Sequence, residues 1–151
     1  MKCKYLVISC MDPRIREQEL FWLKSRGMCP YDLLSFPGSS IWIAKAGWKN
    51  QKQWMAWIVK QFIFYWIALS IKFHETEIII ISHHKFCGAY KWWHGELEGE
   101  KEEEQQKADM RTAMLRIKQN FPQIRKLILV WGELEDEEGK EIVFKEIEMP
   151  E

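Results

Sequence analysis

The order of apolar and polar positions along the chain predicts strands that alternate with helices. Nearly continuous apolar runs are typical of strands buried on both faces, and they predict strands over residues 4–10, 31–36, 75–82 and 125–134. Apolar residues at helical spacing predict helices over residues 15–27, 50–73 and 102–121, with a shorter helix following residue 88. Residues 141–148 alternate apolar and polar side chains after a turn at 136–140, as a half-buried edge strand does.

This alternation predicts an α/β fold. The expected architecture is a central, mostly parallel sheet of about four strands with right-handed crossovers, helices on both faces, and a C-terminal antiparallel edge strand. The sequence contains no internal repeat and no linker-like stretch, so residues 1–151 are expected to form a single domain.

The segment from Trp54 to Phe73 is apolar on nearly every side and about as long as a membrane span. Lys60 and Gln61 lie in its interior, where a lysine costs about 2.5–3.5 kcal/mol in a bilayer. We therefore expect a helix buried between the sheet and a partner subunit, and no membrane span.

Composition narrows the class of protein. The chain has 22 basic and 22 acidic residues, and this zero net charge argues against a nucleic-acid partner. The acidic run over residues 95–107 is interpreted as a solvated loop and helix start. Nine Trp residues are more than one small core can cover, which indicates a homodimer or higher homo-oligomer. The four Cys residues lack a disulfide-framework spacing and no signal peptide is evident, so a reduced, cytoplasmic protein is expected.

Chemistry-bearing residues follow two of the predicted strands. Cys10 ends the first strand, and His84 and Cys87 come just after the strand at 75–82. If these strands are neighbours, the three side chains converge at the carboxyl edge of the sheet, where ligands bind in such folds. Two thiolates and an imidazole favour zinc, and three protein ligands leave the fourth tetrahedral position open.

Asp12 and Arg14 lie close to this predicted site. The Asp12 carboxylate could orient a zinc-bound water or hydroxide, or it could itself be the fourth ligand. Arg14 could hold Asp12 through a two-pronged hydrogen bond, which keeps the carboxylate ionised. Pro13 restricts the backbone between them and stiffens the loop.

The stretches "CMDPR" and "HHKFCG" resemble the Cys-x-Asp-x-Arg and His-x-x-Cys signatures of the β-class carbonic anhydrases. The likeness covers nearly the whole chain, from Lys4 to Ile147. It implies one zinc ion per subunit on Cys10, His84 and Cys87, with Asp12 and Arg14 as a catalytic dyad.

The implied activity is reversible hydration of carbon dioxide to bicarbonate by a zinc-bound hydroxide. The resemblance also implies sites assembled at dimer interfaces. The N-terminal helical arm that many family members wrap around a partner is not expected here, because Cys10 comes almost at once.

The chain also departs from the family. "SFPGSS" (35–40) replaces an Arg-Asn-Ala-Gly-Asn-like stretch, of which Gly38 survives, and His83 occupies a position that is usually Gly. Candidates for contacting substrate or supporting the ligands are Gly38, Ser39, His83 and Gly88. His83 could be a supporting group or an alternative ligand, but the simpler interpretation is a solvent-facing histidine. "PGSS" could also form an anion cradle or an ordinary turn.

Other interpretations remain open. Cys10 and Cys87 could be buried free thiols, as we expect for Cys3 and Cys29, and Asp12 with Arg14 could be a surface ion pair at a helix start. His94 could relay protons or simply end a helix. The spacing of Cys10 and Arg16 also fits a phosphatase loop, although Pro13 and Asp12 disfavour one. The alternative functions are a non-catalytic zinc protein and a hydrolase of carbonyl sulfide or carbon disulfide.

Overall fold

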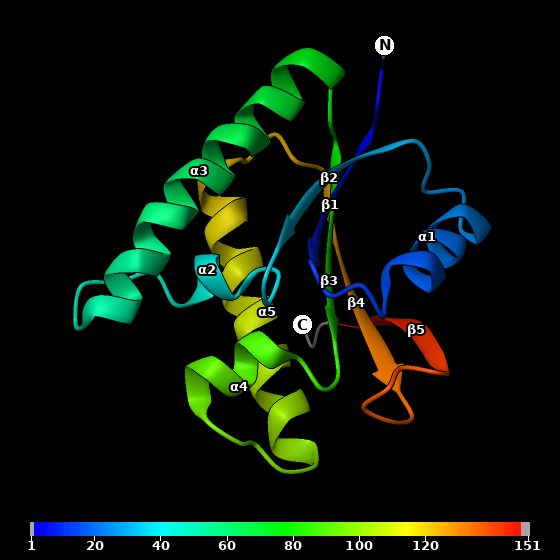
Figure 1. The fold of residues 1–151 in the computed structure, drawn as a ribbon. Helices are drawn as coiled ribbons and strands as arrows, with labels where there is room; N and C mark the ends of the chain where they lie inside the picture. Colours follow the sequence, from blue (N-terminus) through cyan, green and yellow to red (C-terminus); the bar gives the residue numbers. More distant parts are fainter. Residues whose placement is uncertain (1, 149–151) are drawn as a thin grey trace.

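The computed structural model describes residues 2–148 as a central sheet with helices on both faces (Figure 1). The strands are β1 (Tyr5–Cys10), β2 (Tyr31–Phe36), β3 (Ile78–His84), β4 (Lys126–Leu134) and β5 (Ile142–Ile147). The helices are α1 (Arg16–Ser25), α2 (Ile41–Ala44), α3 (Gln51–His74), α4 (Gly88–His94) and α5 (Glu100–Asn120).

The strand order is β2-β1-β3-β4-β5, and only the β4–β5 pair is antiparallel. The predicted α/β class, the four parallel strands and the antiparallel edge strand are therefore confirmed. Chain order and spatial order diverge at β1, because β2 lies on one side of it and β3 on the other. Loops after β1 and β3 thus leave the same edge of the sheet side by side, which is where such folds place their ligands.

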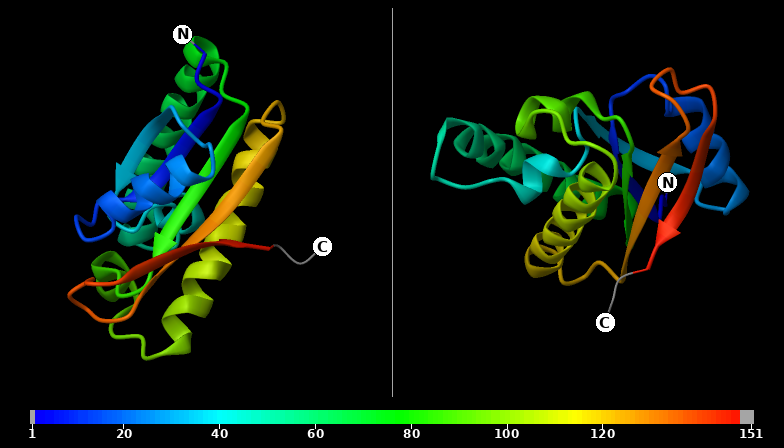
Figure 2. Two further views of the ribbon diagram at one scale, coloured as in Figure 1. Left: turned by 90° about the vertical axis from the view of Figure 1, so that its right-hand side faces the viewer. Right: turned by 90° about the horizontal axis from the view of Figure 1, so that it is seen from below.

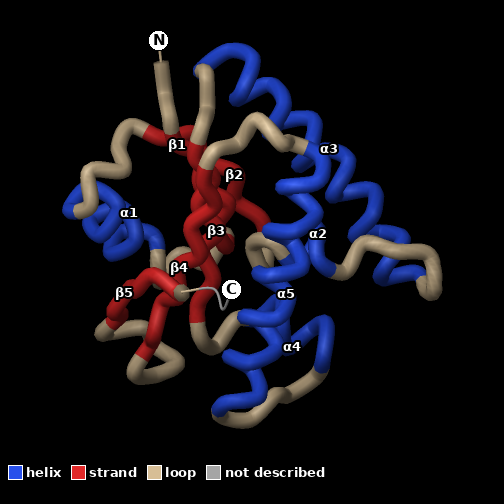
Figure 3. Tube along the Cα trace, turned by 180° about the vertical axis from the view of Figure 1, so that it is seen from behind, coloured by secondary structure: helices blue, strands red, loops and turns tan. Residues whose placement is uncertain are grey.

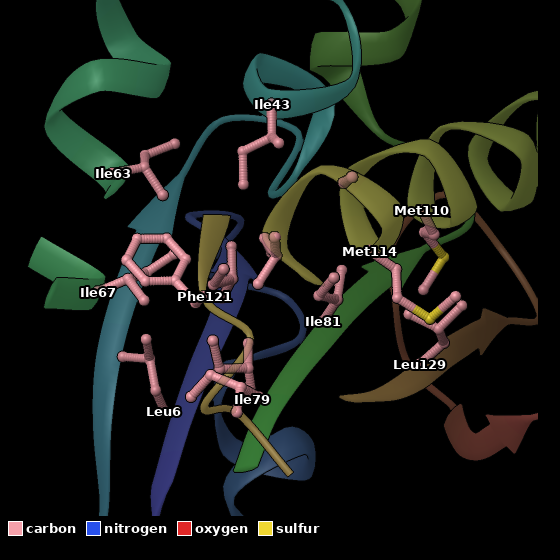
Figure 4. Packing of buried hydrophobic residues seen from close by; sticks show 14 of the residues in the cluster. Leu6, Ile43, Ile63, Ile67, Ile79, Ile81, Met110, Met114, Phe121 and Leu129 are labelled. Carbon is pink, nitrogen blue, oxygen red and sulfur yellow. The ribbon is translucent and has the colours of Figure 1, made fainter. Parts of the chain in front are cut away.

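Two apolar cores lie on opposite faces of the sheet, and the helices divide between them (Figures 2 and 3). On one face, Ile79 and Ile81 of β3 pack against Ile63 and Ile67 of α3 and against Met110 of α5 (Figure 4). On the other face, the intervening Ile80 packs toward the side of α1 and β5. The four consecutive Ile residues of β3 therefore serve both cores, as a strand covered on both faces requires.

The ends of the helices follow local signals in the sequence. The Asn50 side chain accepts a hydrogen bond from the Gln53 N–H at 2.9 Å and so caps the start of α3. Gly27, with φ of 70°, follows the end of α1, as its sequence indicated. Helix α2 was not predicted, because four residues are too few to show a helical period.

Helix α3 is less covered than we expected from its composition. By length and composition alone, this helix could cross a membrane, yet only 22% of its most apolar 18-residue stretch is buried inside the structure. Ile63 and Ile67 face the core, whereas Phe62, Trp66 and Phe73 are exposed. Within one chain the helix is thus covered on the sheet side only, and its other side is an unpartnered apolar face.

Candidate metal centre

Cys10, His84 and Cys87 meet at the carboxyl edge of the sheet. Residues 5–8 of β1 pair in parallel with residues 78–81 of β3, so Cys10 and His84 end adjacent strands. Cys87 directly precedes α4. One ligand atom from each residue lies within 4.8 Å of the other two, and the two sulfur atoms are 3.9 Å apart. All three residues are buried.

The His84 ring is oriented with a free nitrogen in this cluster. Its Nδ1–H donates to the Lys85 carbonyl at 2.8 Å, which leaves Nε2 as the ring nitrogen that can bind a metal. Nε2 is buried and has no hydrogen-bond partner among residues 2–148. A buried polar atom without a partner is costly, and a metal ion in the cluster would satisfy it. The donor set therefore fits zinc.

One hydrogen bond can join the thiols of Cys10 and Cys87, because their sulfur atoms are 3.9 Å apart. The hydrogen bond from the Cys87 thiol lowers the pKa of Cys10 to about 4, and the His84 ring and the Gly38 N–H, 3.3 Å from Cys10 Sγ, act in the same direction. The thiolate at Cys10 in turn raises the pKa of Cys87. Since a metal binds thiolates, its binding would displace the proton of this hydrogen bond.

Asp12 and Arg14 form the two-pronged pair that the sequence suggested. Arg14 donates from Nη2 to Asp12 Oδ2 at 2.6 Å and from Nε to Oδ1 at 3.0 Å. The backbone N–H of Arg14 also donates to Oδ1, at 2.9 Å. These bonds lower the pKa of Asp12 and keep it ionised.

The dyad points at the cluster without belonging to it. Asp12 Oδ2 lies 3.7 Å from His84 Nε2, but the Asp12 carboxylate is not part of the group of three close ligand atoms. Arg14 is itself held by the carbonyls of Phe86, at 2.8 Å, and of Glu137. Arg14 therefore anchors the Asp12 carboxylate beside the cluster.

A cavity of about 450 Å³ adjoins the cluster. Arg14, Cys87 and Gly88 are among its lining residues, together with Glu137 and Tyr90. Of the three cluster residues, Cys87 alone lines this cavity, beside Arg14.

Three other predicted site residues, Gly38, Gly88 and Ser39, lie around the cluster and make different contacts. Gly38, with φ of 79°, donates its N–H to Cys10 Sγ, and a Cβ there would lie 2.9 Å from side-chain atoms of both Ala89 and Ile41. Gly88 begins α4 beside the cavity. Ser39 is buried and donates to the Ile8 carbonyl at 3.0 Å, so it supports the backbone.

The interpretation of His83 as a solvent-facing residue is wrong. Its side chain is 1% exposed, with Nε2 2.7 Å from Ser40 Oγ and Nδ1 2.9 Å from Gln106 Oε1. The two-residue period of β3 places it on the same face as Ile79 and Ile81, toward α5. Burial lowers its pKa to about 4, so the ring is neutral.

Several functional contacts were not anticipated from the sequence. Glu102 and Gln106 lie in the run interpreted as solvated, yet both are buried, and Glu102 accepts the Cys87 N–H at 2.9 Å. Their four-residue spacing on a helix was the available signal. Gly132, opposite His84 in the β3–β4 register, was also missed; a Cβ there would lie 2.8 Å from the Phe144 ring.

The alternative interpretations can also be compared with the structure. Arg16 donates to the Cys10 carbonyl at 2.7 Å and to Ser35 Oγ at 2.9 Å, so it braces strand ends and is not free to cradle a phosphate. Cys3 is a buried free thiol as expected, and Cys29 is a half-buried one. His94 ends α4 and stacks on Tyr90, with ring centroids 5.8 Å apart.

Comparison with known proteins agrees with this geometry. Residues 1–138 match the family described as "Putative carbonic anhydrase". No curated protein matches the chain.

Three solved structures are similar in fold. β-Carbonic anhydrase isoform I of Trichomonas vaginalis has 14% sequence identity and a TM-score of 0.54, and the match covers 95% of this chain and 82% of that one. A carbonic anhydrase of Streptococcus mutans has 16% identity and a TM-score of 0.51, with 97% of this chain and 82% of that one covered. The β-carbonic anhydrase CcaA has 17% identity and a TM-score of 0.52, with 100% of this chain and 80% of that one covered. At these identities the likeness concerns the fold. With the family match over most of its length, the chain belongs to the family of putative carbonic anhydrases.

Proposed function

We propose that the protein is a zinc-dependent carbonic anhydrase that catalyses the reversible hydration of carbon dioxide to bicarbonate. The observation that carries the proposal is the set of three buried ligand atoms within 4.8 Å of one another, with the Asp12 carboxylate 3.7 Å from His84 Nε2. Family membership supports the same reaction.

In this proposal the chain supplies a metal site and a means of directing the attack on carbon dioxide. Zinc on Cys10, His84 and Cys87, one ion per subunit, would lower the pKa of water enough to supply hydroxide near neutral pH. An ionised carboxylate can only accept hydrogen bonds. Asp12 would therefore accept one from the nucleophile and so select the lone pair that attacks.

Arg14 would contribute at two points. Its bonds to Asp12 prevent that carboxylate from rotating, and its guanidinium at the cavity wall places a positive charge where the bicarbonate anion leaves. Because both metal-binding thiols must stay reduced, we also propose that the protein works in the cytoplasm.

We further propose that the protein forms a homodimer through β2 and α3. β2 is an edge strand paired on one side only, and next to it lies a groove of about 480 Å³ lined by Leu33, Phe36, Trp66 and Phe73 among others. A second copy suits this surface because an edge strand can pair with itself across a two-fold axis while two apolar faces cover each other. Sedimentation tests this: wild-type protein should be a dimer, and W66E, which places a charge on the apolar face, should be a monomer.

The activity is tested on protein purified with its metal. We expect about one zinc per chain by elemental analysis and rapid hydration of carbon dioxide in a stopped-flow indicator assay. Carbonyl sulfide and carbon disulfide serve as competing substrates in the same experiment. Full zinc occupancy without hydration at any pH would refute the proposal and favour a non-catalytic zinc protein, and turnover of the sulfur compounds alone would favour the hydrolase.

A further inference from the structure

Four buried polar side chains form a continuous hydrogen-bonded chain behind the metal centre, which we call the strap: Ser40, His83, Gln106 and Glu102. Their exposed fractions are 0%, 1%, 1% and 8%, respectively. They come from three places in the sequence, namely the loop before α2, the end of β3 and one face of α5.

The donor and the acceptor of each hydrogen bond in the strap can be assigned without conflict. The Gln106 amide nitrogen donates to the His84 carbonyl at 2.8 Å and to Glu102 Oε1 at 2.9 Å. Its amide oxygen therefore accepts from His83 Nδ1–H at 2.9 Å. This leaves His83 Nε2 to accept from the Ser40 hydroxyl at 2.7 Å and from the Ser40 N–H at 3.3 Å.

The strap reaches the backbone of the His-x-x-Cys motif at both of its ligands. Gln106 holds the carbonyl of His84, and Glu102 accepts the N–H of Cys87 at 2.9 Å. At its other end, Ser40 lies two residues from Gly38, whose N–H donates to Cys10 Sγ. The strap thus binds the backbone of two candidate ligands directly, and it fixes the loop whose Gly38 N–H donates to the third.

We propose that Ser40, His83, Gln106 and Glu102 are positioning residues that hold the three metal ligands at their binding distances. None of the four side chains is among the three close ligand atoms. Gln106 and Glu102 act through the ligand backbone that they hold, and His83 and Ser40 act through Gln106. This inference rests on the proposed zinc site. It extends that proposal by assigning a role to His83 and to a loop that lacks the bracing residues usual in the family.

The test is the rate at which the zinc-loaded protein releases its metal to an excess of chelator. Q106A removes the central link and E102A frees the Cys87 N–H, so each should release zinc about 10–100-fold faster than wild type. E102Q keeps an oxygen at the position that accepts both hydrogen bonds, and should release zinc at nearly the wild-type rate. Q105A is the matched control, because Gln105 is next to the strap on α5 but its amide donates to Asp109 instead.

A second readout separates positioning from general stability. With cobalt in place of zinc, the thiolate-to-cobalt and d–d absorption bands should shift in Q106A and remain unchanged in Q105A. Release rates in Q106A and E102A equal to wild type would overturn the proposal, as would equal acceleration in E102A and E102Q. If Q106A and E102A do not fold, S40A decides, because unchanged release after loss of that hydroxyl also contradicts the strap.

The outcome is independent of catalytic activity. A wild-type protein that binds zinc without hydrating carbon dioxide would refute the proposed function and leave the release experiment valid. An active wild-type enzyme whose variants keep their metal would refute the strap alone.

Discussion

Replacing Asp12 by Asn tests whether this carboxylate orients the nucleophile or binds the metal. Asp12 accepts hydrogen bonds from the Arg14 backbone N–H and Nε at one oxygen and from Nη2 at the other. Asn offers a single oxygen, so its NH2 group would face either Nη2, where Oδ2 now accepts at 2.6 Å, or the Nε and backbone N–H of Arg14, where Oδ1 now accepts. D12N should therefore break one prong of the dyad while it keeps the shape of the side chain.

The magnitude follows from the bonds that are lost. A hydrogen bond between charged partners contributes about 1.5–3 kcal/mol, and the Asp12 and Arg14 side chains are only 14% and 25% exposed, so solvent screens the pair weakly. If the whole of this energy acts in the transition state, its loss corresponds to a decrease of about 10–150-fold in kcat. Zinc content should not change, because Asp12 lies outside the group of three ligand atoms.

The assay pairs stopped-flow carbon dioxide hydration with elemental analysis of the same samples. R14K should lower kcat about as much as D12N does, because an ammonium keeps the charge but cannot donate two parallel hydrogen bonds to the carboxylate. D136N is the control: Asp136 caps the nearby turn through the Gly139 N–H at 2.7 Å and should be dispensable for catalysis. Loss of zinc from D12N would show that the carboxylate is a ligand, and undiminished kcat would refute the orienting role.

Three further predictions concern stability. G38A should lower the free energy of unfolding by about 2–5 kcal/mol in urea titrations, because it combines a left-handed backbone with two contacts at 2.9 Å; wild-type stability would contradict this reasoning. Burial raises the pKa of Glu19 above its usual 4.5. The contribution of Glu19 to the free energy of unfolding is therefore fully present below pH 4.5 and is lost as pH rises through the folded-state pKa. E19Q should therefore melt higher than wild type at pH 7 and lose this advantage in acid; a pH-independent difference would exclude burial as the cause. Removing zinc with a chelator should lower Tm, zinc but not magnesium should restore it, and an unchanged Tm would argue against a metal site.

The fold could be predicted because its main signals are local. Ile78–Ile81 indicate a strand covered on both faces, and alternation over residues 141–148 indicates an edge strand with one face in water. The surroundings of α3 could not be predicted in the same way. Its composition shows that many apolar side chains need cover, but not whether the cover comes from this chain, a second copy or lipid.

The candidate ligands could be predicted for a topological reason. Parallel neighbours end at one edge of the sheet, so Cys10 and His84 meet once β1 and β3 are placed side by side. Glu102 and Gln106 escaped prediction because their burial depends on where α5 crosses the loop after β3. The acidic run around them shows the usual features of a solvated surface, and their four-residue spacing places them on one helix face without showing that this face is buried.

The two departures from the family pattern concern a single contact. In the sequence, "SFPGSS" appears as the loss of bracing groups and His83 as an unrelated substitution for glycine. In the structure, Ser40 from the first lies 2.7 Å from the ring of the second, and that ring in turn bonds to Gln106. A glycine at position 83 would leave the Ser40 hydroxyl and the Gln106 oxygen buried without partners, a cost of about 1–3 kcal/mol for each. The substitutions therefore make physical sense only together, with the imidazole filling space and forming hydrogen bonds that the altered loop does not supply.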